Sequence, residues 1–273
     1  MKKIILSAVA LAILSVVACK KDNSVAIDAA EMIAVSSEDL SNAESSTQSS
    51  EDELDEVLDD SGLKVRGDCP TVTLSAPKGT FPQTATLTFS GDCKDRNGRT
   101  RKGQIVVTVT DSMMRTGAKK TVVYKAFMLD SLTFDGTRTW TNAGKNAAGQ
   151  PTFTRTVENA KITYPDGTVA TWSASHTVTK TKGFETPRIF IDDEFTVTGG
   201  ASGVNRKGVT FTSAITTPIV HRATCQWIVS GVRTFTVGDK TFSLDYGYGG
   251  GSCDNKAELT LANGLTKVIT LRR

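Results

Sequence analysis

Residues 157–180, VENAKITYPDGTVATWSASHTVTK, carry the pattern that decides the fold. Tyr164-Pro165-Asp166-Gly167 is a turn sequence, because proline and glycine supply the backbone angles that a tight reversal needs. After the turn, two sets of residues alternate: Val169, Thr171, Ser173 and Ser175 in one set, and Ala170, Trp172, Ala174 and His176 in the other. A period of two places the sets on opposite faces of a strand. The segment therefore predicts an antiparallel hairpin, 157–163 with 168–180, that has one solvated and one packed face.

The same hairpin pattern continues toward the C-terminus. The further strand pairs, each with its turn, are 233–236 and 241–246 around Val237-Gly238-Asp239-Lys240, and 257–261 and 265–271 around Asn263-Gly264. Residues 195–198 and 209–215 flank a glycine-rich stretch that we expect to be a loop. Almost no apolar residues recur at helical spacing, so strands dominate the prediction.

The region 67–273 is long enough, at 207 residues, to bury a large core. The content of 38% hydrophobic and 22% charged residues excludes a disordered chain, a multi-span membrane protein and a collagen. We expect an all-β fold, a long antiparallel meander that is sandwich-like or an open barrel. It forms either one unit or two similar β units, 67–145 and 146–273, since the segments from Thr86 and Thr241 share a strand, a glycine-rich turn, a cysteine and a strand.

The first 18 residues have the features of a lipoprotein signal peptide. Lys2 and Lys3 precede an apolar run, 4–18, that is shorter than the roughly 20 residues of a spanning helix. The run ends in Val-Val-Ala before Cys19, as in a lipobox. We expect acylation of Cys19 and anchoring in the outer membrane of a bacterium, on the periplasmic or the surface-facing side.

Residues 19–66 are rich in Ser, Glu and Asp and contain 13 acidic against four basic residues. Such a composition is typical of a flexible tether. A capping box that begins at Ser50 predicts one short helix at 51–60, whose apolar stripe either docks on the following domain or remains a nascent turn.

Four cysteines remain after Cys19, an even number that fits disulfides in an oxidising compartment: Cys69, Cys93, Cys225 and Cys253. Three pairings are open. Similar separations favour Cys69 with Cys93 and Cys225 with Cys253. A zinc site would normally have two closely spaced cysteine pairs, which this chain lacks, and we expect no metal and no cofactor.

The region after residue 66 is basic, with 26 basic and 16 acidic residues and a net charge of +10. Eight of the cations fall on or beside two turns: Lys94, Arg96, Arg99, Arg101, Lys102, Arg115, Lys119 and Lys120. If these turns meet, they form a patch suited to an anionic polysaccharide or lipopolysaccharide, because guanidinium groups bind carboxylate, sulfate and phosphate in pairs of hydrogen bonds. The alternative is a solvated sheet edge whose charges prevent aggregation. Nucleic acid does not fit the compartment.

Two other groups are candidate sites. Tyr246 and Tyr248 flank a glycine in a loop and, if exposed, would stack on sugar rings. Asp192 and Glu194 are the densest carboxylates and would be the acid and base of a glycoside hydrolase, although no second partner is evident locally. No nucleophile motif accompanies the two histidines. A third function class is a lipid or lipoprotein carrier with an apolar β groove.

Four segments resemble recurrent sequences of uncharacterised Bacteroidota lipoproteins: CKDRNGRTRKG from Cys93, GTRTWTN from Gly136, ITYPDGT from Ile162 and SCDNKAELTL from Ser252. The resemblance covers most of the chain after the tether and implies a secreted, acylated, β-rich envelope protein. It implies no site residues. Together with the residue patterns, it leads us to expect a lipid-anchored protein with a binding or structural role and no catalysis.

Overall fold

The computed structural model describes residues 35, 36, 39, 69–95, 98–186, 189, 191–225 and 227–271. Several predicted features lie outside these residues: the signal peptide 1–18, the acylated Cys19, the helix at 51–60 and Arg96. In the part of the chain that is described, no helix is both long and apolar enough to cross a membrane.

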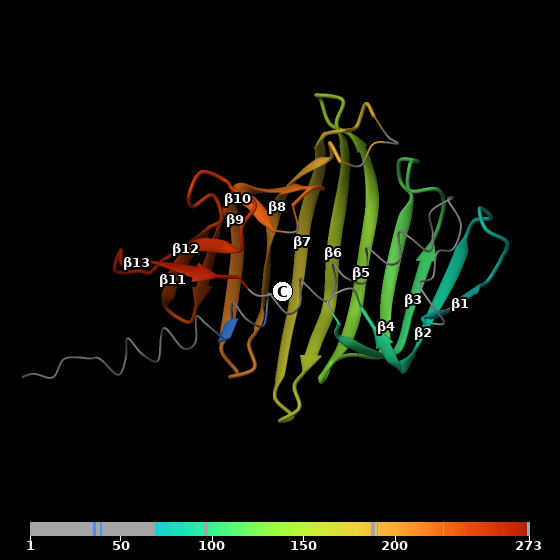
Figure 1. The fold of residues 1–273 in the computed structure, drawn as a ribbon, viewed down its shortest axis with the longest axis horizontal. Helices are drawn as coiled ribbons and strands as arrows, with labels where there is room; N and C mark the ends of the chain where they lie inside the picture. The colour runs from blue at the N-terminus through green and yellow to red at the C-terminus, as the bar shows by residue number, and fades with distance from the viewer. Residues whose placement is uncertain are drawn as a thin grey trace, which may run out of the picture.

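The described chain folds as a single antiparallel sheet of 13 strands whose spatial order is the order of the sequence (Figure 1). The strands are β1 (Thr71–Leu74), β2 (Gln83–Lys94), β3 (Thr100–Val109), β4 (Lys119–Leu129), β5 (Leu132–Lys145), β6 (Pro151–Thr163), β7 (Val169–Lys182), β8 (Glu194–Val204), β9 (Thr210–Arg222), β10 (Ile228–Val237), β11 (Lys240–Asp245), β12 (Lys256–Thr260) and β13 (Thr266–Thr270). The predicted all-β meander is confirmed. The sheet is open, with β1 and β13 at its edges.

The three predicted hairpins are present as β6–β7, β10–β11 and β12–β13. The predicted glycine-rich loop is wrong, because Gly199, Gly200 and Gly203 lie inside β8. A Cβ at Gly203 would collide with the carbonyl of Thr171, so β8 approaches its neighbour too closely for a side chain. Glycine here serves close packing of strands rather than a reversal of the chain.

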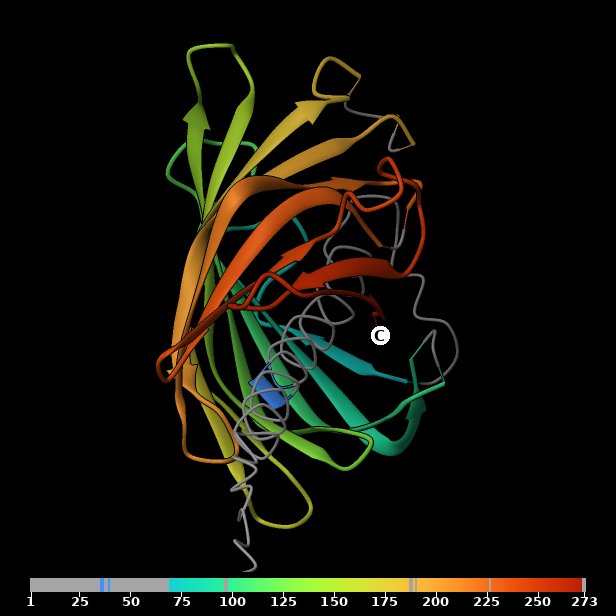
Figure 2. The ribbon, with the colours of Figure 1, turned by 90° about the vertical axis from the view of Figure 1, so that its left-hand side faces the viewer.

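The sheet is curled, because shifts of register interrupt the pairing of many adjacent strands. At Gly103, φ is +95° and a Cβ would collide with the backbone of Ala126 on β4. An extra residue in one strand bends it and increases its twist. Figure 2 shows the result, an arc with β1 and the C-terminal strands at its two ends and the short blue helical part, which the colour bar places at residues 35, 36 and 39, inside the curve.

One face of the sheet, called the packed face here, carries two clusters of buried apolar side chains. The first spans β2 to β7, where the rings of Phe89 and Phe127 lie 5.4 Å apart. The second spans β7 to β12, where Phe235 and Phe242 stack at 5.0 Å. Trp172 packs against both clusters. The predicted boundary at 145/146 falls in the β5–β6 hairpin, across which the sheet is continuous.

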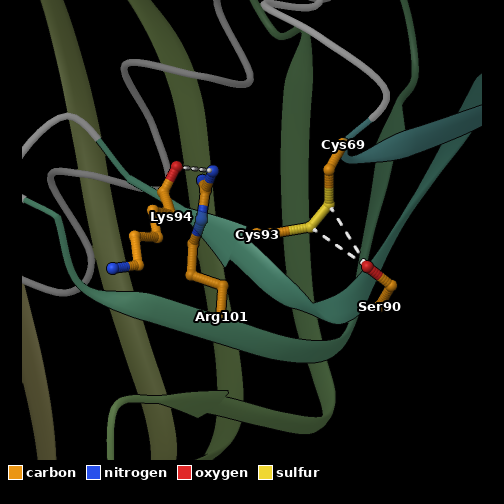
Figure 3. The surroundings of a disulfide bond; sticks show 5 residues. All are labelled: Cys69, Ser90, Cys93, Lys94 and Arg101. Carbon is orange, nitrogen blue, oxygen red and sulfur yellow. Dashed lines mark hydrogen bonds between the residues drawn. A yellow bond between two sulfur atoms is a disulfide. The ribbon is translucent and has the colours of Figure 1, made fainter.

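Two cysteine pairs lie at disulfide distance, Cys69 with Cys93 and Cys225 with Cys253, each with Cα atoms 5.6 Å apart. This is the pairing that the sequence separations favour. Figure 3 shows that Cys93, near the end of β2, holds Cys69 just before β1. Since Cys93 belongs to the first apolar cluster, the chain enters the sheet on the packed face.

Candidate functional site

The two basic turns predicted to form one patch lie at opposite ends of β3, a strand of ten residues. At about 3.3 Å per residue, that separates them by roughly 30 Å. Each turn also neutralises an arginine locally: Arg99 pairs with Asp95 at 2.6 Å, and Arg115 with Asp111 at 3.0 Å. Lys94, Lys102 and Lys119 are exposed. The structure therefore does not bring the predicted set together as one surface.

Arg101 and Lys120, two members of the predicted set, lie on the packed face instead. The Arg101 side chain donates a hydrogen bond to the Lys94 carbonyl at 3.1 Å and covers the ring of Phe89, 4.7 Å from its centroid (Figure 3). Burial lowers the pKa of Arg101. Because strand residues alternate between faces, both side chains share a face with the apolar core while Lys102 and Lys119 do not.

The strand register continues from Lys120 into a line of cationic and aromatic side chains across the packed face. Lys120 lies opposite Trp140, Trp140 opposite Arg155, and Arg155 opposite His176. The same line then passes through Gly199 on β8 and Ile215 on β9 to Arg233 on β10. We call this set the basic row: Lys120, Trp140, Arg155, His176 and Arg233.

Close contacts join four side chains of the basic row, Lys120, Trp140, Arg155 and His176. Trp140 lies between two cations, with Lys120 Nζ 5.8 Å and Arg155 Cζ 5.5 Å from its ring centroid. Arg155 Nη2 is 3.3 Å from His176 Nδ1, and Arg138, 5% exposed, lies on the packed face two residues before Trp140. The electrons of an aromatic ring attract a cation that lies over its face, so Trp140 stabilises both of its charged neighbours. Burying this much positive charge is costly unless anionic groups oppose it.

Part of the N-terminal region docks on the sheet, at the end that carries the β6–β7 and β8–β9 turns. Val35, Ser36 and Asp39 are helical and buried. Asp39 accepts hydrogen bonds from the Tyr164 hydroxyl at 2.5 Å and from the Arg206 amide at 2.9 Å. The Arg206 guanidinium also pairs with Asp39 at 3.6 Å and covers the Tyr164 ring.

A second contact belongs to the same docking site. The Asn205 side-chain amide donates a hydrogen bond to Ser36 Oγ at 2.9 Å. Asn205 also accepts hydrogen bonds from the amides of Lys207 and Val209, which fix the β8–β9 turn. The conformation of the turn is therefore fixed by its own hydrogen bonds, without Ser36 or Asp39. The contacts of Ser36 and Asp39 bind part of the predicted tether to the sheet.

The predicted tyrosine pair is divided between two environments. Tyr246 is 6% exposed and belongs to the second apolar cluster, and its amide donates a hydrogen bond to the Gly231 carbonyl. Tyr248 is exposed. Because only one of the two rings reaches solvent, they do not form a stacking platform.

The carboxylates predicted as an alternative catalytic pair each have local partners. Asp192, in the turn before β8, accepts a hydrogen bond from Thr186 at 2.6 Å. Glu194 accepts hydrogen bonds from Lys182 at 3.0 Å and from Arg222 at 3.1 Å. Asp193 between them is buried and pairs with Lys180 at 2.8 Å. The hydrolase function stays a prediction.

The contribution of Glu194 to the free energy of unfolding is expected to depend on pH. Burial raises the pKa of Glu194, but hydrogen bonds and charge from Lys182 and Arg222 outweigh burial, and the pKa is lowered overall. A carboxylate with a lowered pKa stabilises the fold above its unfolded pKa and loses that contribution as the pH falls. We expect Glu194→Gln to cost about 1 kcal/mol in urea unfolding at pH 7 and almost nothing at about pH 3. Glu158→Gln, at an exposed position, is the control; an equal cost at both pH values would refute the expectation.

Neither the basic row nor the docking of Asp39 was predicted from the sequence. Arg138, Arg155 and Arg233 each stand two residues from a large apolar side chain of the packed face, and this alternation was an available signal. For the docking residues 35, 36 and 39, the only signal in the sequence was their spacing, which is that of one helix face. Comparison of the chain with protein-family models, curated proteins and solved structures finds no match in any of the three.

Proposed function

We propose that the chain is a lipid-anchored, non-catalytic protein of the bacterial outer membrane that binds an anionic glycan or lipopolysaccharide. The basic row is the observation that carries the binding part of the proposal. The anchoring part rests on the sequence before and at Cys19. The resemblance to Bacteroidota lipoproteins agrees with the same location.

The chemistry of the row, together with Arg138 two residues before Trp140, suits an acidic sugar polymer. Arg138 and Arg155 supply paired N–H donors that match the two oxygens of a carboxylate or the oxygens of a sulfate or phosphate. Trp140 supplies an aromatic face between the cations for the apolar face of a sugar ring. Successive strands lie about 4.8 Å apart, so Lys120 on β4 and Arg155 on β6 are about 10 Å apart along the row, with Trp140 on the strand between them.

Binding by the full-length protein tests the proposal. The probes are alginate, chondroitin sulfate and lipopolysaccharide, with neutral dextran as the blank, each at low and at near-physiological salt. We expect saturable binding of at least one anionic probe, and we expect Arg138→Gln with Arg155→Gln to weaken it by about tenfold or more. Alginate carries carboxylates alone, whereas chondroitin sulfate adds sulfates and lipopolysaccharide adds phosphates, so binding of alginate would show that carboxylates suffice.

A matched variant removes the same charge elsewhere. Lys102→Gln with Lys125→Gln changes two exposed cations outside the row and is expected to leave affinity within about twofold. Circular dichroism of both double variants establishes that they are folded. Equal weakening by the two variants, or binding that vanishes with modest salt for every polymer alike, would count against a site on the basic row.

A lipid or lipoprotein carrier is the second candidate, and the curvature of the sheet favours it. The sheet is curved (Figure 2), and the two apolar clusters belong to its packed face, which would shield acyl chains from water. Organic extraction of the purified full-length protein, followed by mass spectrometry, checks this function. A stoichiometric lipid would favour the carrier over the glycan-binding protein.

A further inference from the structure

We propose that β13, the C-terminal edge of the sheet, pairs with β13 of a second copy of this chain and so joins two sheets into one. In the described chain, β13 has β12 on one side and no strand on the other (Figure 1). Leu265, just before the strand, is 63% exposed, and Val268 at its centre is 41% exposed. The edge is therefore open to solvent and displays two large apolar side chains. This pairing is independent of glycan binding, because β13 lies outside the basic row.

The backbone of β13 directs hydrogen-bonding groups away from β12 at alternate residues. The Leu261 amide donates a hydrogen bond to the Leu265 carbonyl at 2.9 Å, and the Leu271 amide donates one to the Asn255 carbonyl at 2.6 Å. Antiparallel pairs alternate between residues that exchange both backbone hydrogen bonds and residues that exchange none, so the odd-numbered residues 265–271 bond to β12. The residues whose N–H and C=O groups point outward are the even-numbered ones: Thr266, Val268 and Thr270. These groups offer a second strand its hydrogen bonds.

The sequence of β13 is self-complementary about Val268. A twofold axis through Val268 sets the two copies of β13 antiparallel and places Val268 opposite Val268 of the second copy. Thr266 of each copy then lies opposite Thr270 of the other. All three outward-directed residues of each copy meet outward-directed residues of the other, which gives about six backbone hydrogen bonds. A shift by one residue would set outward-directed residues against inward-directed ones and lose these bonds.

The same register continues the second apolar cluster across the junction. Ile269 and Leu271 are partly buried residues of that cluster, and the alternation of the strand places Leu265 and Lys267 on the same face. In the pair, the exposed Leu265 lies opposite Leu271 of the second copy. Lys267, the one charged residue of β13, lies opposite Ile269, whose surface its aliphatic stem covers. Apolar side chains therefore gain neighbours, and like charges do not face each other.

Twofold pairing also determines the size and strength of the assembly. The pair is closed, because each copy uses its β13 once and offers no second β13. It is weak, since a junction of five residues on each side buries less than the roughly 1,200 Å² of a standard interface. We therefore expect a reversible dimer with dissociation in the micromolar range.

Analytical ultracentrifugation of the full-length protein, over about 1–100 µM, measures the dimer. Val268→Pro removes the N–H at the centre of the junction, and proline is tolerated in an edge strand where that N–H faces away from the sheet. We expect Val268→Pro to weaken dimerisation by about tenfold or more. The matched control, Val268→Thr, keeps the N–H and the β-branched shape and should stay within about threefold. Circular dichroism establishes that both variants are folded.

Cysteine cross-linking tests the register and does not depend on the proline variant. Facing residues of a hydrogen-bonded pair have Cα atoms about 5.5 Å apart, within the range that a disulfide spans. We expect mild oxidation to link two Val268→Cys chains. Thr270→Cys, on the same face of the strand but away from the axis, should remain unlinked. The unchanged chain, which also contains Cys19, gives the background.

Several outcomes of these two experiments would overturn the proposal: a monomer at every concentration, oligomers larger than a dimer, or equal cross-linking of the two cysteine variants. A dimer that Val268→Pro leaves intact would do the same. Failure of the glycan probes would leave these results unchanged, because the two experiments report on β13 and not on the basic row.

Discussion

Replacing Phe127 with alanine is expected to lower the free energy of unfolding by about 3–5 kcal/mol. Phe127 is 1% exposed and is the centre of an aromatic group, since its ring lies within 6.2 Å of the rings of Phe89, Tyr124 and Phe134. The bulged pairing of β4 with both neighbours fixes the backbone there, so the sheet cannot collapse into the cavity. The loss therefore includes the apolar transfer energy and most of the cavity energy.

Urea unfolding followed by circular dichroism measures this loss. Phe81→Ala, at a partly exposed ring in the β1–β2 loop, is the matched control and should cost about 1 kcal/mol or less. A cost below about 1 kcal/mol for Phe127→Ala would mean that the first cluster does not stabilise the sheet. Phe235→Ala in the second cluster extends the experiment: one shared transition indicates one unit, and two transitions indicate the halves 67–145 and 146–273.

Asp39→Ala is expected to cost about 3 kcal/mol and to release the docked part of the N-terminal region. The Asp39 carboxylate accepts hydrogen bonds from the Tyr164 hydroxyl and the Arg206 amide, and it forms an ion pair with the Arg206 guanidinium. Without it, these groups either remain buried without an acceptor or regain water when the segment leaves. Release of the segment is possible because the segment is not a strand of the sheet. The loss of unfolding free energy therefore cannot exceed the free energy of docking.

Two measurements follow Asp39→Ala. Urea unfolding gives the cost, and the rate of proteolysis within residues 20–68 reports release. Asp239→Ala removes a carboxylate that is 84% exposed and should change neither. Unchanged stability together with unchanged proteolysis would show that the contacts of Asp39 are not what holds the segment.

The hairpins were predictable because their information is local. In 163–169 and 261–266 the turn residues and the alternation on either side fix where the chain reverses and which face is packed. Neighbouring hairpins then pair in sequence order, which gives the meander. The error at Gly199–Gly203 came from assigning glycine to a reversal when strand packing required it.

The basic row was not predictable from local patterns. Lys120, Arg155 and Arg233 are brought into line by the registers of the strands from β4 to β10, which contain several bulges, and a bulge moves the alignment by one residue. The predicted patch failed for the same kind of reason: proximity in sequence placed two turns together that a ten-residue strand holds apart. Contacts such as that of Asp39 with Tyr164 join residues 125 positions apart and leave no periodic trace.

The docking of Asp39 shortens the free stretch of chain between an acylated Cys19 and the sheet. With the whole region 19–66 as a tether, the sheet could stand off the bilayer by well over 100 Å. With Val35 bound to the sheet, only the stretch from Cys19 to Val35 remains, a maximum reach of about 55 Å. The pull of the lipid anchor would then act at the β6–β7 and β8–β9 turns. These turns would face the bilayer, and the hairpins at the opposite end, β5–β6 and β7–β8, would point away from it (Figure 1).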